Sequence, residues 1–176
     1  MKHRRGARPA PAVEILVECA RWNGRRGVRP LLRRAIAEAA TALSTKAVTR
    51  SMKTATSGAE IAIVLTDDSA IRKLNRAWRG RNEPTNVLAF PAGRQAKPQR
   101  FLGDIVIAYE TLAREAAAER KPFAHHLAHL AVHGFLHLCG YDHETDRQAV
   151  AMERLEVAIL ARLRIPHPYI AHSRSS

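Results

Sequence analysis

Three histidines within eleven residues have the spacing of a metal site. They are His133, His137 and His143 in the stretch HGFLHLCGYDH. Residues four apart on an α-helix project about 40° apart around the axis, so His133 and His137 point the same way. Gly140 suits a left-handed turn that ends the helix and returns His143 to the same point. Three imidazoles with a fourth position left to water are typical of a catalytic zinc site.

A zinc ion held in this way would support two kinds of hydrolysis. It would lower the pKa of a bound water from ~15.7 to about 7, and it polarises carbonyl and phosphoryl oxygens alike. The histidine spacing matches the protease motif H-E-x-x-H-x-x-G-x-x-H, whose glutamate is the general base. This chain has Gly134 at the position of that glutamate. A protease interpretation therefore lacks its proton acceptor.

The motif belongs to a longer series of histidines, of which we expect only one pair to bind the metal. His125, His129, His133 and His137 follow one another at spacing four. Only the last pair adjoins the returning His143, so we expect His129 to support the ligands and His125 and His126 to face solvent. Cys139 lies on a different face of the helix from His137, which predicts a packed thiol rather than a ligand.

The composition predicts one basic domain that does not cross a membrane. The chain has 176 residues, 46% of them hydrophobic, and no apolar run near the ~20 residues of a membrane helix. Two cysteines are too few for a disulfide framework, so we expect a reducing cytoplasm. Glu14 and Glu18 interrupt the apolar segment after the basic N-terminus, which argues against a secretory signal.

The charge favours a polyanionic partner. The net charge is +13, and residues 1–56 contribute +10 of it, from 13 basic and 3 acidic side chains. Such an excess on a small domain is typical of proteins that bind nucleic acid. A membrane partner fits less well, because no basic amphipathic helix with bulky apolar residues is evident.

Hydrophobic periodicity divides the chain into strands and helices around the motif. We interpret residues 1–12 as a flexible basic arm, 13–163 as a single domain and 164–176 as a tail. The pattern predicts strands at 13–19, 59–65, 85–90 and 102–108, a basic loop at 21–29, and helices at about 30–43, 67–78, 109–120, 122–139 and 145–163. Pro84 and Pro91 flank the third strand, which suits the edge of a sheet.

Four segments in order resemble the YbeY family of bacterial rRNA maturation factors, which are metal-dependent single-strand endoribonucleases. They are LNRAWR, PTNVLAFP, LGDIVI and the histidine motif, and the resemblance covers roughly residues 60–162, including Met152 and Glu156. It implies an α+β fold, in which a small mixed four-stranded sheet packs with about five helices and the metal site lies at the end of a central helix. It also implies one Zn²⁺ on His133, His137 and His143.

The resemblance also implies roles outside the motif. Arg79 matches an arginine near the metal and could bind the scissile phosphate through a bidentate contact, and Arg81 stands where a basic residue is usual. Asp104 matches the acid of the third segment. It could orient a ligand histidine or accept a proton, or it could be a structural acid that caps a loop. The family has serine where this chain has Ala89, so that hydroxyl is absent.

The implied function is endonucleolytic cleavage of RNA in 16S rRNA 3′-end maturation and ribosome quality control. The implied partners are rRNA, the small ribosomal subunit and its assembly factors, in the cytoplasm. Two alternatives stay open at this point. One is a non-catalytic, metal-containing factor that binds RNA or the ribosome during assembly. The other is a zinc metalloprotease, which Gly134 disfavours.

Overall fold

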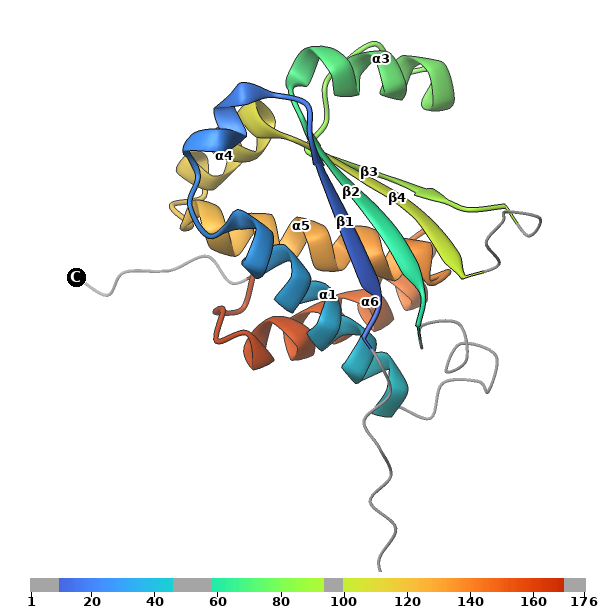
Figure 1. Cartoon of the computed structure of the whole chain (residues 1–176). Helices are drawn as coiled ribbons and strands as arrows, with labels where there is room; N and C mark the ends of the chain where they lie inside the picture. The colour runs from blue at the N-terminus through green and yellow to red at the C-terminus, as the bar shows by residue number, and fades with distance from the viewer. Residues whose placement is uncertain (1–9, 46–57, 94–99, 170–176) are drawn as a thin grey trace, which may run out of the picture.

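The chain folds around one four-stranded sheet, seen in a computed structural model that describes residues 10–45, 58–93 and 100–169 (Figure 1). Its strands are β1 (Ala12–Val17), β2 (Glu60–Thr66), β3 (Val87–Pro91) and β4 (Phe101–Ala108), in the order β1-β2-β4-β3. β1, β2 and β4 are parallel, and β3 runs antiparallel to β4 at the edge. The predicted mixed sheet and the edge position of the proline-flanked strand are confirmed.

Five α-helices pack with this sheet in the described part of the chain. They are α1 (Val28–Thr45), α3 (Asp68–Arg79), α4 (Tyr109–Ala118), α5 (Phe123–Leu138) and α6 (Asp146–Arg162). α5 is central, because it contacts β3 and β4 as well as α1, α4 and α6. Figure 1 shows α1, α5 and α6 together on one side of the sheet, with α3 apart from them. The predicted α+β class and the central position of the motif helix are confirmed.

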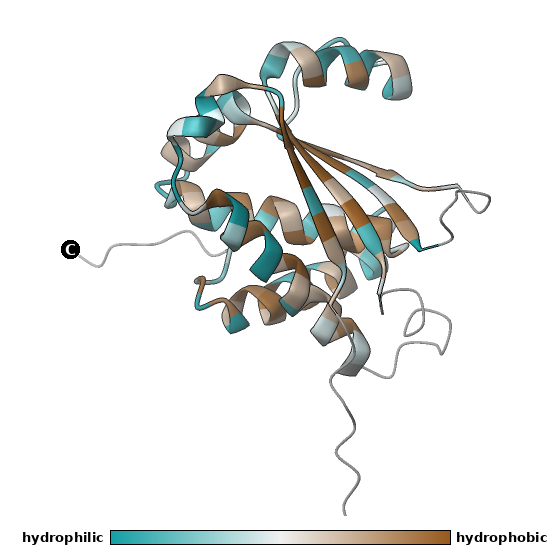
Figure 2. Cartoon of the chain, in the orientation of Figure 1, coloured by the Kyte–Doolittle hydropathy of each residue, from teal (hydrophilic) through white to brown (hydrophobic). Residues whose placement is uncertain are grey.

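Strand alternation gives the sheet two different faces. Ile63, Ile105 and Ile107 are fully buried within the main core, toward α5. Leu88 and Val106 belong to the other face, where they form a smaller core with Ile71 of α3. Figure 2 shows the apolar strands between these layers.

Three segments that were expected to be a loop, an arm and a tail include residues that pair or pack with the rest of the domain. Trp22, expected in a basic loop, lies in the short 3-10 helix η1 (Ala20–Gly24), is only 3% exposed and donates its indole N–H to the Thr66 carbonyl oxygen at 2.9 Å. Of the predicted arm, residues 1–9 lie outside the described part, and Ala12 already pairs in β1. Of the predicted tail, Ile165 is buried in the core.

No helix in the described ranges is long and apolar enough to span a membrane.

Gly134 lets α5 approach β4 closely. A Cβ atom at this position would lie 2.8 Å from Cγ2 of Ile105, well inside van der Waals contact. Ile105 is fully buried and β-branched, so its side chain has little freedom to move away. A glycine inside a helix normally costs stability. Here the close packing of helix on sheet requires it, and a glutamate would not fit.

We expect Gly134→Ala to lower the free energy of unfolding by about 1–2 kcal/mol. Overpacking of a core typically costs about 1–3 kcal/mol, which outweighs the gain of up to about 1 kcal/mol in helix propensity. Urea unfolding would measure the difference. Gly24→Ala is the matched control, because a Cβ there meets no atom within 4 Å. A Gly134→Ala variant as stable as the wild type would contradict this packing argument.

Candidate metal centre

The structure brings the three predicted ligands together at the end of α5. The ligating nitrogens of His133, His137 and His143 lie within 4.8 Å of one another, and Nε2 of His133 and Nε2 of His137 are 3.1 Å apart. A tetrahedral zinc ion with Zn–N bonds of ~2.0–2.1 Å separates its ligand nitrogens by about 3.3–3.4 Å. The residues present therefore fit one metal ion with small adjustments of the rings.

A C-terminal turn of α5 returns His143 to the helical pair. Gly140 has φ +85°, the left-handed conformation expected of it. Its N–H donates to the His137 carbonyl oxygen at 2.9 Å, and the N–H of Tyr141 donates to that of Leu136 at 3.0 Å. This pair of bonds is the Schellman arrangement that closes many helices. Asp142 then accepts the backbone N–H of His143 at 2.8 Å, so this acid shapes the turn.

A buried carboxylate from α6 orients the first ligand. Glu156 is only 1% exposed, and its Oε1 lies 2.7 Å from Nδ1 of His133. Its Oε2 lies 3.2 Å from Nε2 of His129 and also accepts the hydroxyl of Tyr169. When Nδ1 of His133 carries the proton of this bond, Nε2 keeps its lone pair for a metal. His129 thus supports the site without being a ligand.

The sequence pattern did not predict this role of Glu156, although the residue belongs to the family resemblance. A signal was present, because Glu156 interrupts an apolar stripe of α6 next to Leu155 and before Ile159. A charged side chain in such a stripe is buried only when it has partners. The partners lie on α5, and a one-dimensional pattern does not identify them.

The electrostatics keep these groups in the forms that a metal site needs. Burial alone would raise the pKa of Glu156, but hydrogen bonds from His129, His133 and Tyr169 outweigh it and lower the pKa to about 2. Burial, followed by the neighbouring His133 and His143, lowers the pKa of His137. Glu156 is therefore charged and His137 neutral at pH 7, and the neutral imidazole is the form that binds metal.

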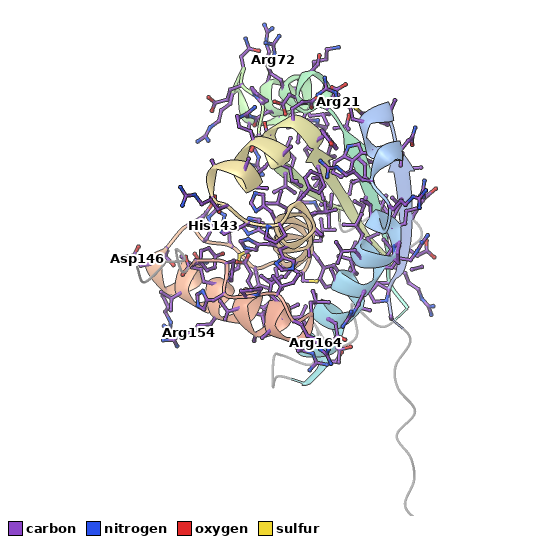
Figure 3. All side chains as sticks on the ribbon, turned by 90° about the vertical axis from the view of Figure 1, so that its left-hand side faces the viewer. Arg21, Arg72, His143, Asp146, Arg154 and Arg164 are labelled. Carbon is purple, nitrogen blue, oxygen red and sulfur yellow. The ribbon has the colours of Figure 1, made fainter. Side chains whose placement is uncertain are left out.

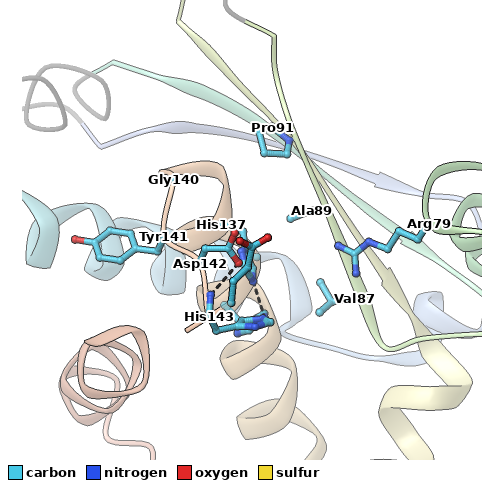
Figure 4. Close-up of a pocket in the computed structure, with 12 residues that line it drawn as sticks. Arg79, Val87, Ala89, Pro91, His137, Gly140, Tyr141, Asp142 and His143 are labelled. Carbon is cyan, nitrogen blue, oxygen red and sulfur yellow. Dashed lines mark hydrogen bonds between the residues drawn. The ribbon is translucent and has the colours of Figure 1, made fainter. Parts of the chain in front are cut away.

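The ligands open into a cavity of about 580 Å³ that α3 and β3 help to wall (Figure 4). Arg79, in the last turn of α3, extends toward the histidines, and Gly80 caps that helix in a left-handed conformation. The remaining lining is apolar on β3 and polar on the turn, namely Val87, Ala89, Pro91, Gly134, Gly140, Tyr141, Asp142 and Glu144. Arg79 thus lines the same cavity as the three histidines.

Other residues singled out in the sequence lie elsewhere. Asp104 pairs in register with Phe90 on the opposite face of the sheet and lines a second groove there, where burial raises its pKa. Arg81 is exposed just beyond α3 and is not part of the cavity lining. The expectation that His126 faces solvent is wrong, because it is buried and its Nε2 lies 2.8 Å from a carboxylate oxygen of Glu115. Burial also raises the pKa of the Cys139 thiol to about 12, as suits a packed thiol.

Comparisons with known proteins agree on one family. The family described as Endoribonuclease YbeY matches residues 31–164. A protein named Endoribonuclease YbeY from Nitrobacter hamburgensis is 51% identical over 170 residues, covering 93% of this chain and 85% of the relative. One of the same name from Bradyrhizobium sp. strain BTAi1 is 47% identical over 172 residues, covering 94% and 96%. A solution structure from Thermotoga maritima shares the fold, with a TM-score of 0.54 and 21% identity over 93% of this chain and 99% of that one.

We expect Glu156→Gln to weaken zinc binding about 10- to 100-fold, the usual effect of losing a carboxylate that orients a ligand histidine. A neutral amide cannot stabilise the same three donors. A competition titration against a coloured chelator would measure the affinity, with circular dichroism to verify the fold. Glu60→Gln removes an exposed charge elsewhere and serves as the control. Unchanged zinc affinity in Glu156→Gln would refute the orienting role.

Proposed function

Because the chain belongs to the YbeY endoribonuclease family, we propose that it hydrolyses single-stranded RNA at a metal ion held by His133, His137 and His143. The observation that carries the proposal is the convergence of three histidine nitrogens in an open cavity that Arg79 also lines. Phosphodiester hydrolysis needs an activated water, a Lewis acid and charge stabilisation at the phosphate. A metal ion bound to the three histidines would supply the first two, and Arg79 the third.

The donor set supports zinc as the metal. Imidazole nitrogen suits zinc, although nickel, copper and cobalt also accept it. When bound, the ion would supply Lewis acidity and activate a water at neutral pH. His133 and His137 would hold it from the C-terminal half of α5, and His143 from the turn that follows the helix. Three protein ligands leave a coordination position open, which favours catalysis over a purely structural metal.

Arg79 is the residue of this chain suited to bind the scissile phosphate. Its guanidinium offers paired N–H donors that match two phosphate oxygens. The left-handed cap at Gly80 ends α3 directly after Arg79, so this side chain projects from a defined helix terminus. Arg81 follows two residues later and is exposed, so it would contact a neighbouring phosphate of the same strand. Asp104 lies on the other face of the sheet, so we assign it no contact with the reacting atoms.

We place this activity in 16S rRNA 3′-end maturation and ribosome quality control. The partners are rRNA, the small ribosomal subunit and its assembly factors, and the location is the cytoplasm. Family membership and the net charge of +13 support this assignment. A metalloprotease is disfavoured because Gly134, where such enzymes carry their base, packs against Ile105.

His137→Ala should abolish both metal binding and RNA cleavage, because the loss of one of three ligands leaves only two protein donors. Metal analysis of the purified protein and cleavage of a labelled single-stranded RNA would measure the two effects. His125→Ala is the matched control, since it removes a histidine of the same helix that does not line the cavity. Cleavage by metal-free His137→Ala would contradict the mechanism. Tight RNA binding by metal-loaded wild type without turnover would indicate the non-catalytic assembly factor instead.

Arg79→Ala should lower kcat/KM for RNA cleavage by about 100-fold, the usual scale for losing a group that stabilises developing charge. Arg79→Lys should recover only part of the loss, because an ammonium group does not make the paired contact. Arg154→Ala removes an equal charge from the exposed surface of α6 and should leave kcat/KM within about twofold of the wild type. Equal effects of the Arg79 and Arg154 variants would mean that only net charge matters.

A further inference from the structure

A second groove, on the sheet face opposite the metal centre, contains an exposed tryptophan that contacts a half-buried phenylalanine. The groove has a volume of about 800 Å³ and lies between α3 and strands β2, β3 and β4. Val64, Leu74 and Val106 form part of its apolar wall. Trp78 stands at the groove with 72% of its surface exposed, and its ring centroid lies 5.8 Å from that of Phe90. Phe90 therefore supports an indole whose remaining surface faces solvent.

This groove, which we term the aromatic groove, adjoins the metal cavity at the edge strand β3, whose Pro91 lines both. Trp78 and Arg79 are consecutive residues of α3, and they line the aromatic groove and the metal cavity respectively. Along β3 the side chains alternate, so Ala89 faces the metal cavity and Phe90 the aromatic groove. β3 has only β4 as a neighbour in the described sheet, so an extended ligand can cross its outer edge.

The helix between the two sites carries a strong positive charge. α3 has four basic residues, Arg72, Lys73, Arg76 and Arg79, against the single acid Asp68. Asp68 is already engaged, because it accepts the Thr111 hydroxyl at 2.7 Å and pairs with Arg114 at 3.5 Å. None of the four cations forms an ion pair with another residue that the structure describes. Figure 3 shows Arg72 projecting outward from α3.

The lining of the aromatic groove itself carries two carboxylates, Glu18 and Asp104, against one cation, Lys73 of α3. The carboxylates repel phosphate. A nucleic-acid strand would therefore keep its backbone on the basic surface of α3 and turn a base inward. Carboxylates accept hydrogen bonds from base N–H groups, so Asp104 suits the edge of a base better than its phosphate.

We propose that Trp78, supported by Phe90, is a base-stacking subsite for single-stranded RNA. A nucleobase flanking the phosphate at Arg79 stacks on the exposed indole, while the cations of α3 follow the backbone. Every base has a face that stacks on an aromatic ring, so such a subsite tolerates different sequences. Bases within a duplex cannot leave their stack to reach it, which provides a structural cause for single-strand preference. This inference rests on the proposed function and adds a subsite to it.

Binding of a short single-stranded RNA to chelator-treated full-length protein tests the subsite without cleavage. Trp78→Ala should weaken binding about 5- to 100-fold, the range that base–aromatic stacking covers. Trp78→Tyr should retain binding within about threefold, because it preserves an aromatic face. A strand of equal length with tetrahydrofuran spacers in place of bases should bind wild type and Trp78→Ala equally. Val150→Ala removes another exposed apolar side chain and should change neither affinity.

Tryptophan fluorescence adds a local readout, because the chain has only two tryptophans and Trp22 is buried. RNA should quench the emission of wild type, and Trp78→Tyr should lose this response. Unchanged RNA affinity in Trp78→Ala would overturn the subsite and would leave the groove to a protein partner. A loss of affinity for the spacer strand equal to the loss for RNA would also overturn it. Cleavage by metal-loaded wild type is measured in parallel, so its absence would refute the proposed function rather than the subsite alone.

Discussion

The charge of Glu156 is the interaction on which the metal centre depends. A carboxylate buried to this extent is costly unless hydrogen bonds and opposite charges compensate it. Here donors from His129, His133 and Tyr169 supply that compensation. The same bonds join α5, α6 and the segment after α6 into one unit. The orientation of His133 is therefore a property of the whole helical layer and not of the motif alone.

Side chains of a β-strand alternate between the two faces of the sheet, and this alternation is a second constraint on the metal centre. Gly134 holds α5 against Ile105, and the neighbouring Asp104 must then face away from the metal centre. One thin layer of backbone thus separates a cavity with imidazoles from a groove with carboxylates and an indole. Their different chemistries can serve one extended ligand, because β3 is short and its outer edge is accessible from both sides.

Local patterns were sufficient to predict most of the elements and the clustering of the three histidines. Spacing four on a helix and a glycine before the third histidine specify His133, His137 and His143, and these relations do not depend on distant packing. Alternation along LGDIVIA also determines the face of the sheet on which Asp104 lies, since Ile105 and Ile107 must face the core together. The side chain of Asp104 then lies on the opposite face. This inference requires knowing which face of the strand packs against the core. Glu156 and the buried Trp22 depend on contacts between segments far apart in the sequence, which no single-segment pattern contains.

The outer edge of β3 carries a further consequence for association between molecules. Unpaired strand edges invite a strand from another chain, and here such pairing would cover the mouth of the metal cavity. β3 is only five residues long and ends in Pro91, which has no N–H to offer a partner strand. The short strand and its proline therefore protect the protein from edge-to-edge aggregation and keep the approach to its metal centre clear of other copies.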